Sequence, residues 1–257
     1  MSAAGCMTLW FCASTLAEDT PPAMTVTLEA AVVSAYASRG QVVCDDPVIQ
    51  AACGISKGCF SFQSWINWDL TKHGASGSRE ITEVDLTFAY SRQFGPVASQ
   101  AGLTEYLFPN QTAVDETGCG RASDGTREAF ISLSLPDAAI VPTLKVFLDI
   151  DEVSGWYATF TLAYEHPLPF DPLTLRLEGG AGYANADYND SYFYADRSTW
   201  NEGTAAMTLL YKASEGGVLS AAVQYMCLLN DELRGNASEA YAAERSLFGT
   251  VKCSWTF

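Results

Sequence analysis

The chain has 257 residues, enough for one large all-β domain or two domains of average size. Charged residues make up 17% of it, below the roughly 25% of typical soluble domains, while hydrophobic residues make up 48%. This balance is typical of a protein with a second apolar surface besides its core. The net charge of −16, with 14 Lys and Arg, excludes nucleic acid as a partner, because nucleic-acid binding needs clustered basic side chains.

The first residues have the pattern of an export signal. No acidic or basic residue precedes Glu18, residues 3–16 are apolar or small, and Ala17 is a small residue at the expected cleavage position. We interpret residues 1–17 as a secretory signal peptide that lacks the usual positive N-terminal region, and residues 18–257 as a single domain. A lipoprotein signal ending at Cys6 and a buried N-terminal helix are the alternatives.

After this leader, ten segments have the pattern of β-strands, most with alternating polar and apolar residues. Most run about 9–13 residues, which exceeds the usual strand of a soluble sheet and suits tilted strands that cross a membrane. No run of about 18 apolar residues, as a transmembrane helix needs, follows residue 20. The predicted strands are 25–36, 59–70, 81–91, 126–135, 143–151, 155–165, 172–184, 202–212, 218–228 and 245–257.

The connections between these strands alternate in length. With a periplasmic N-terminus, the inner connections 71–80, 136–142, 166–171 and 213–217 are all short. Four of the five outer connections are long; the five are 37–58, 92–125, 152–154, 185–201 and 229–244. Long outer loops and short periplasmic turns are typical of outer-membrane barrels. We therefore predict an all-β fold, a transmembrane antiparallel β-barrel of about ten strands. Twelve stays open, because 92–125 has room for another strand pair around Leu103 to Phe108.

Each predicted strand has one apolar and one polar face, which a soluble sandwich would also have. The aromatic residues favour the barrel, because Tyr and Trp gather near strand ends, as at the two membrane–water interfaces. On strands expected to run outward these are Tyr36, Tyr90, Tyr183 and Tyr225. On strands expected to run inward they are Trp68, Tyr164, Tyr211 and Trp255.

The inward face carries charged residues that are candidates to line a pore. They are Glu29, Glu83, Asp85, Glu128, Lys145, Asp149, Asp151, Arg176 and Glu178. Acids outnumber bases, so an open lumen should favour cations. A ten-stranded barrel is narrow, however, and Trp65, Phe130, Phe147 and Phe248 also point inward. A lumen closed by paired charges is therefore an equal alternative.

Several short motifs in the first two-thirds of the chain resemble the TorF-type porin family of bacterial outer-membrane proteins. They are Ser34-Ala-Tyr36-Ala-Ser-Arg39-Gly40, Asp46-Pro47-Val48-Ile-Gln50, Trp65-Ile-Asn67-Trp-Asp69-Leu, Glu105-Tyr106-Leu-Phe108-Pro109 and Asp149-Ile-Asp151-Glu-Val-Ser-Gly155-Trp-Tyr157. The resemblance implies a β-barrel porin or porin-like protein in the outer membrane. The cysteines depart from it, because so many are not expected in a barrel of this kind.

Four cysteines fall in or beside the first two predicted outer loops: Cys44, Cys53, Cys59 and Cys119. We predict that two disulfides join them, since an exported compartment permits disulfides, and the connectivity stays open. Zinc is disfavoured because no Cys-x-x-Cys pair is present. Cys227 and Cys253 fall in the lipid-facing phase and should not bond to each other.

The chain ends on an alternating strand closed by Phe257, the expected signal for the barrel-assembly machinery. We predict no enzyme, because the two histidines fall in inner turns, and no metal or cofactor. The favoured function is passive passage of small solutes or ions through a barrel embedded in outer-membrane lipid. A closed barrel whose disulfide-linked outer loops contact a partner is the alternative, and a soluble secreted lectin-like sandwich is a third hypothesis.

Overall fold

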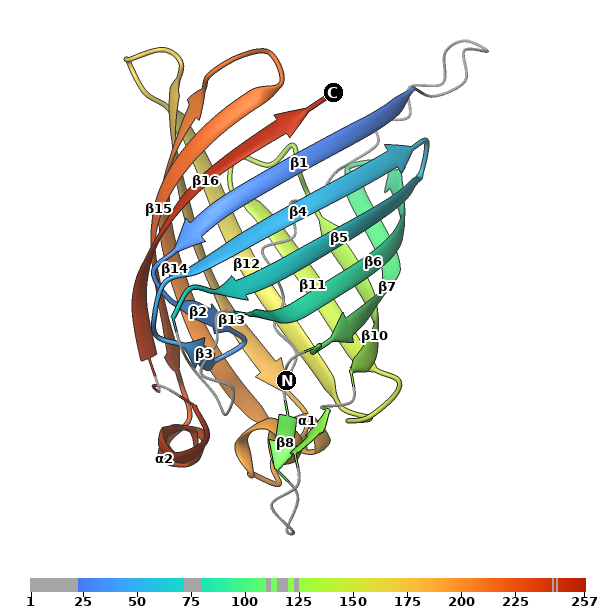
Figure 1. Ribbon diagram of the computed structural model, residues 1–257. Helices are drawn as coiled ribbons and strands as arrows, with labels where there is room; N and C mark the ends of the chain where they lie inside the picture. Colours follow the sequence, from blue (N-terminus) through green and yellow to red (C-terminus); the bar gives the residue numbers. More distant parts are fainter. Residues whose placement is uncertain are drawn as a thin grey trace.

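The computed structural model describes residues 23–71, 80–109, 112–114, 120–122, 125–241, 243 and 245–257. These residues form a closed barrel of twelve strands in which every neighbouring pair is antiparallel (Figure 1). The predicted fold class is confirmed, with the larger of the two strand counts. The predicted signal peptide, residues 1–17, lies outside the described residues and stays a prediction. The barrel strands are β1 (Met24–Val33), β4 (Val48–Lys57), β5 (Phe60–Asp69), β6 (Ile81–Phe94), β7 (Val97–Leu107), β10 (Thr126–Ser134), β11 (Val141–Asp149), β12 (Trp156–Pro167), β13 (Leu173–Ala184), β14 (Thr199–Lys212), β15 (Gly217–Leu228) and β16 (Arg245–Thr256).

The two ends of the barrel differ, as the connection lengths predict. At the short-turn end, the chain reverses within two residues after β4 and after β6. Gly58 and Gly95 make these reversals with φ of 60° and 56°, a backbone conformation that favours glycine. At the long-loop end lie the longer connections and both helices (Figure 1). In outer-membrane barrels the short turns face the periplasm and the long loops face outward.

The first and last strands close the barrel. β1 pairs with β16 in a register that sets Leu28 opposite Trp255. Beyond the strand end, the Phe257 N–H donates to the Val26 carbonyl at 2.9 Å, and the Val26 N–H donates to the Phe257 carbonyl at 3.1 Å. The chain therefore ends at the short-turn end with its last residue still paired (Figure 1).

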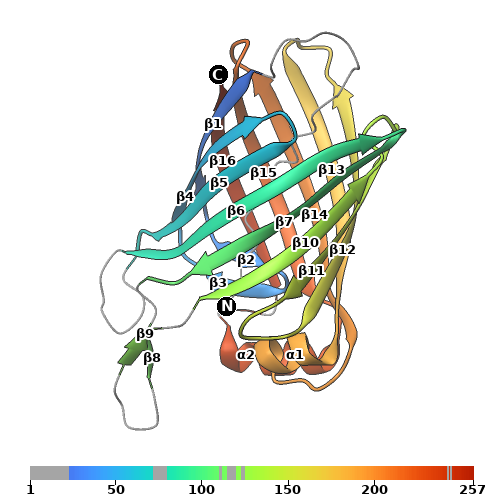
Figure 2. The same ribbon diagram turned by 90° about the vertical axis from the view of Figure 1, so that its right-hand side faces the viewer.

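The outer surface of the barrel is apolar. Along β6, for example, Phe88 and Tyr90 are exposed, whereas Asp85, Thr87 and Ala89 between and beside them are buried inside. The strands are tilted, as Figure 2 shows, and exposed apolar residues recur on each of them. Large exposed apolar surface of this kind is stable only against lipid.

Aromatic side chains lie at both edges of this apolar surface. Near the short-turn end the exposed aromatic residues include Phe60, Tyr90, Tyr164, Tyr211 and Trp255. Near the long-loop end they include Trp68, Trp156, Trp200 and Tyr225. The two predicted interface levels are therefore present. Trp68 and Tyr90, however, each lie at the level opposite to the predicted one. Trp68 lies near the long-loop end because β5 runs toward it, and Tyr90 lies near the short-turn end because β6 runs away from the long loops.

This difference follows from two strands that the sequence pattern missed. β4 lies in the predicted outer loop 37–58, and β7 lies in the predicted connection 92–125. β4 has Ala51, Ala52 and Gly54 at its centre, and small residues on both faces hide the alternation on which strand prediction depends. The connection 71–80, predicted as an inner turn, joins strands at the long-loop end, and its residues 72–79 lie outside the described part.

The remaining elements lie in the long connections. They are the hairpin β2 (Tyr36–Ser38) and β3 (Gln41–Cys44), the hairpin β8 (Thr112–Val114) and β9 (Gly120–Ala122), and the helices α1 (Ala186–Phe193) and α2 (Asp231–Ala240). The helices cover the long-loop end and pack on each other, with the Tyr241 hydroxyl donating to the Tyr192 carbonyl at 2.7 Å (Figure 1). Among the described residues, no helix combines the length and hydropathy needed to cross a bilayer.

Candidate functional site in the barrel lumen

The hairpin β2–β3 lies inside the barrel, near the long-loop end (Figures 1 and 2). Its turn consists of Arg39 and Gly40, with φ of 48° and 82°. Two successive positive φ values are the geometry of the tightest β-hairpin turn. Arg39 adopts it at a cost of roughly 1–2 kcal/mol, because it carries a Cβ. Contacts of its side chain offset that cost.

The Arg39 guanidinium is held by the barrel wall. Its Nη1 and Nη2 donate to the two carboxylate oxygens of Glu128 on β10, at 2.6 and 2.8 Å. Its central carbon lies 4.1 Å from the ring centroid of Phe147 on β11 and 5.2 Å from that of Tyr157 on β12. The Tyr106 hydroxyl on β7 also donates to Glu128, at 2.8 Å. We call Glu128, Phe147, Tyr157 and Tyr106 the guanidinium cage.

The ion pair inside this cage is almost completely buried, since each of the two side chains is 2% exposed. Removing one partner from a buried pair leaves the other charge without compensation, which typically costs about 3–5 kcal/mol. The bidentate geometry and the aromatic faces suit a planar guanidinium better than an ammonium group. The cage therefore fixes the position of the hairpin in the lumen.

Other hairpin residues contact β5, β6 and the helix α1. The Tyr36 hydroxyl donates to Glu83 on β6 at 2.8 Å, and the Tyr36 ring lies 5.9 Å from that of Trp65 on β5. Gln41 donates to the Tyr188 hydroxyl of α1 at 3.4 Å. The predicted position of Tyr36 at the lipid interface is wrong, because the strand ends at Val33 and Tyr36 is buried inside the barrel.

Glu202 on β14 supports the cage from a third side. It accepts a hydrogen bond from the Tyr157 hydroxyl at 2.6 Å and another from the Gly40 backbone. The hairpin thus contacts β5, β6, β10, β11, β12, β14 and α1. It crosses the lumen at this level rather than lining one wall.

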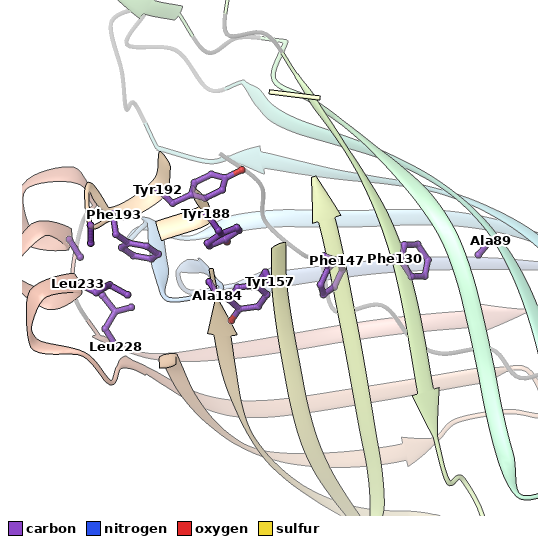
Figure 3. Packing of buried hydrophobic residues seen from close by; sticks show 12 residues of the cluster. Ala89, Phe130, Phe147, Tyr157, Ala184, Tyr188, Tyr192, Phe193, Leu228 and Leu233 are labelled. Carbon is purple, nitrogen blue, oxygen red and sulfur yellow. The ribbon is translucent and has the colours of Figure 1, made fainter. Parts of the chain in front are cut away.

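A row of aromatic side chains continues from the cage to the helices (Figure 3). Phe130, Phe147 and Tyr157 come from adjacent strands, with ring centroids 6.3 and 6.4 Å apart, and Tyr188 of α1 lies 5.1 Å from Tyr157. A glycine on the neighbouring strand β13, Gly182, leaves space for one of these rings. A Cβ on Gly182 would lie 1.8 Å from the Tyr157 hydroxyl oxygen. The aromatic residues therefore fill part of the lumen, as a narrow barrel requires.

Two of the predicted pore-lining residues, Glu83 and Glu128, contact the hairpin, and a third, Asp85, points inward beside Glu83. Glu83 and Asp85 point inward from β6, and Glu128 points inward from β10. Glu83 accepts the hydrogen bond from Tyr36, and Glu128 accepts those from Arg39. Asp85 is buried, and its Oδ1 accepts no hydrogen bond from any described group.

Four further candidates point into the barrel closer to the short-turn end. The Lys145 ammonium lies 4.4 and 4.5 Å from the ring centroids of Phe130 and Phe147. Glu29 pairs with Lys252 at 3.5 Å. Arg176 pairs with Glu178 at 2.6 Å and with Glu165 at 3.1 Å, and these side chains are 35–52% exposed. Side chains in this half of the lumen are therefore more exposed than the ion pair at the hairpin level.

The last two candidates organise the connection between β11 and β12. Asp149 accepts hydrogen bonds from the Asp151 and Val153 backbone N–H groups, each at 3.0 Å, and from the Thr126 hydroxyl at 2.6 Å. Asp151 lies 3.8 Å from Arg127, which alternates with inward-facing Glu128 and so points out of the barrel beside Glu105. The structure thus places Asp151 at the outer rim.

The cysteines do not form the predicted disulfides. Cys44, Cys53 and Cys59 are free thiols, and Cys119 lies outside the described residues. Two disulfides among four cysteines would require a bond between two of those three, so the two-disulfide prediction is wrong. Cys44 lies on the lumen hairpin, Cys53 on the exposed face of β4, and Cys59 in the turn at the opposite end. Cys227 and Cys253 are also free, and Cys227 lies opposite Arg245 rather than opposite Cys253.

Within the described ranges, no group of three or more His, Cys, Asp or Glu side chains is arranged to hold a metal ion. Sequence analysis missed the most connected residues of the lumen: Arg39, Tyr106, Tyr157 and Glu202. The sequence signal for this hairpin was weak, because Gly40 marks a turn but Arg39 is not one of the residues that usually precede glycine in a two-residue hairpin turn.

No family model matches the sequence, and neither does any curated protein. Among solved structures, a KdgM porin in complex with disordered oligogalacturonate is similar, with 10% identity, a TM-score of 0.52, and coverage of 91% of this chain and 99% of that one. A second KdgM porin structure matches with 9% identity, the same TM-score and the same coverage. The outer-membrane channel COG4313 from Pseudomonas putida F1 matches with 8% identity, a TM-score of 0.52, and coverage of 93% and 96%.

The chain has the fold of an outer-membrane porin. At this identity the likeness concerns the fold alone, and it covers nearly the whole of each chain. Together with the apolar outer surface and its two aromatic edges, the fold places the protein in the bacterial outer membrane.

Proposed function

We propose that this barrel passes small solutes or ions across the outer membrane through a lumen constricted by the hairpin β2–β3, with a weak preference for cations. The observation that carries the proposal is the Arg39–Glu128 ion pair, with each side chain 2% exposed, in a charged lumen near the long-loop end. Charged residues inside a barrel either close it by pairing or line a path through it. A permeation path uses them to select among solutes.

The preference for cations rests on the balance of charge in the lumen. Near the hairpin, Asp69, Glu83, Asp85, Glu128 and Glu202 are buried acids, and the buried base Arg39 pairs with Glu128. Charges in a confined, low-dielectric passage act more strongly on an ion than the same charges in bulk water. The KdgM porin was solved with oligogalacturonate, an acidic sugar chain. The acidic lumen of this chain favours the opposite charge.

The resemblance of the short motifs to TorF-type porins supports the same function. Arg39, Asp69, Tyr106 and Tyr157 belong to these motifs. The structure brings Arg39, Tyr106 and Tyr157 to one site. The motifs that carry the resemblance thus supply the constriction.

A closed barrel is the second candidate, and the packing of the hairpin favours it. The hairpin, the aromatic row and both helices fill much of the long-loop end. In that case the loops at this end would bind a partner, without the disulfides that sequence analysis expected.

Planar bilayers with a salt gradient separate the two candidates. We expect the refolded wild-type protein to give reproducible current steps with a cation-favouring reversal potential. The Glu83→Gln/Asp85→Asn variant should shift that potential toward zero, whereas Glu105→Gln, which removes a charge outside the barrel, should not. Silence from protein that migrates as a folded, heat-modifiable barrel would exclude a pore and support the closed barrel.

A further inference from the structure

We propose that the guanidinium cage is a solute-binding site, that Arg39 occupies it as a tethered ligand, and that the solutes it takes are organic cations with a guanidinium group. This inference rests on the proposed function and names its substrate class. The hairpin then acts as a built-in competitor that incoming solute displaces.

All the groups of the cage come from the barrel wall and not from the hairpin. Phe147 is paired with Phe130 and with Tyr157 in the strand ladders, so the ring positions are set by backbone register. Tyr106 and Glu202 fix the polar ends, through Glu128 at 2.8 Å and through the Tyr157 hydroxyl at 2.6 Å. The cage is therefore preorganised, and it would keep its shape if Arg39 left.

The chemistry of the cage selects a planar cation. A carboxylate that accepts two parallel N–H groups matches the fork of a guanidinium, and the faces of Phe147 and Tyr157 add cation–π attraction. An ammonium group fits less well, because it is not planar and offers no fork. This difference makes the proposal specific for guanidinium over amine.

A second acidic group lies beside the cage. Asp85 is 6% exposed and shares a side-chain hydrogen bond with Glu83, its Oδ1 accepts no hydrogen bond from the described residues, and its interaction with Arg39 is weaker than that with Glu83. A ligand with a guanidinium at one end and an amine at the other could use both acids. The Arg39 side chain carries no amine at its other end, because that end is attached to the hairpin backbone.

The tether weakens binding of free ligand without abolishing it. A side chain held next to its site competes with an effective concentration of about millimolar or more. Removing the side chain while keeping the turn should therefore unmask the site.

Arg39→Asn is the variant that does so, since Asn-Gly is the preferred sequence for this hairpin turn. Isothermal titration of folded protein in detergent, with agmatine as the probe, measures the result. We expect Arg39→Asn to bind agmatine at least about tenfold more tightly than wild type, because the tethered competitor is gone. Cadaverine, a diamine without a guanidinium, should bind at least about tenfold more weakly than agmatine.

Two control variants keep this test specific. Arg127→Asn makes the same change at the Arg127–Glu105 pair outside the barrel, and it should create no agmatine site. Arg39→Asn/Glu128→Gln should lose the site again. If Arg39→Asn does not fold, Arg39→Lys keeps the charge but loses the fork, and agmatine should bind it more tightly than wild type.

The proposal is overturned if agmatine binds none of the Arg39 variants, if cadaverine binds equally well, or if Arg127→Asn behaves like Arg39→Asn. This experiment is independent of conduction. A barrel that binds agmatine but gives no current would refute the proposed pore and support the guanidinium site. A barrel that conducts but does not bind agmatine would support the pore and refute the site.

Discussion

At the scale of single residues, the Arg39–Glu128 pair governs how the lumen is filled. A buried ion pair seldom adds net stability over an apolar substitute, because both charges lose their hydration. It does specify position, since no other arrangement of the hairpin would satisfy both charges. The strained backbone at Arg39, with φ of 48°, fits this view, because the turn is held by its side chain.

Glu128→Gln tests the pair directly. The substitution leaves the buried guanidinium without its counter-charge, and we expect a loss of about 3 kcal/mol in the free energy of unfolding. The heat-modifiable gel transition should shift to lower temperature. Glu165→Gln, which removes a carboxylate from a half-exposed pair near the short-turn end, is the control and should shift it little. Equal shifts for the two variants would argue against a buried, position-defining pair.

Cys44 reports on the hairpin without changing it. Burial raises the pKa of the Cys44 thiol to about 11, so at pH 8 only about a thousandth of it is the reactive thiolate. Maleimide should label Cys59 in the folded protein and leave Cys44 unmodified, and it should label both after unfolding. Since the thiolate fraction grows as pH approaches the pKa, labelling of Cys44 should increase between pH 8 and 10. Equally fast labelling of both cysteines at pH 8 would place the hairpin outside the barrel.

At the scale of elements, alternation of side chains predicted ten of the twelve strands and the face of nearly every residue in them. It failed where small residues lie on both faces, as at Ala51, Ala52 and Gly54 of β4. The two helices were missed because they lie within loops and are only 8 and 10 residues long. Their start signals are nevertheless present, since Asn185 and Asn230 cap the first turns.

The hairpin inside the lumen could not be predicted from pattern alone. Its position depends on contacts between residues far apart in sequence, such as Arg39 and Glu128, which are 89 positions apart. A polar loop outside the barrel and a polar hairpin inside it have the same composition. The sequence therefore predicted which acids face the lumen, but not which of them meet at one site.

Glycine at defined positions lets the aromatic row fit between strands, and Gly182→Ala tests this packing. Its new Cβ would overlap the Tyr157 hydroxyl and break the hydrogen bond to Glu202, so we expect a loss of about 1–3 kcal/mol. Gly179→Ala on the same strand is the matched control, because its nearest neighbour would be an ordinary 3.7 Å away. Thermal unfolding in detergent measures both, and equal midpoints would contradict the packing argument.

At the scale of the whole molecule, the pairing of β1 with β16 closes the barrel, and this pairing extends to Phe257. Phe257 exchanges two backbone hydrogen bonds with Val26, at 2.9 and 3.1 Å, and its ring is exposed at the short-turn end. We propose that this exposed ring is also what the assembly machinery recognises. Deleting Phe257 should therefore reduce the amount of folded barrel in outer membranes more strongly than the yield of refolding in detergent. An equal reduction in both would assign Phe257 a role in stability alone.

The central claim is that the hairpin β2–β3 constricts a conducting lumen. The most direct measurement is single-channel conductance of a variant in which residues 35–45 are replaced by a short Gly-Ser linker, compared with the wild-type protein in the same bilayer. Because the hairpin crosses the lumen, its removal should raise the conductance several-fold and keep the preference for cations. A variant that folds as a heat-modifiable barrel and conducts no better than wild type would contradict the claim.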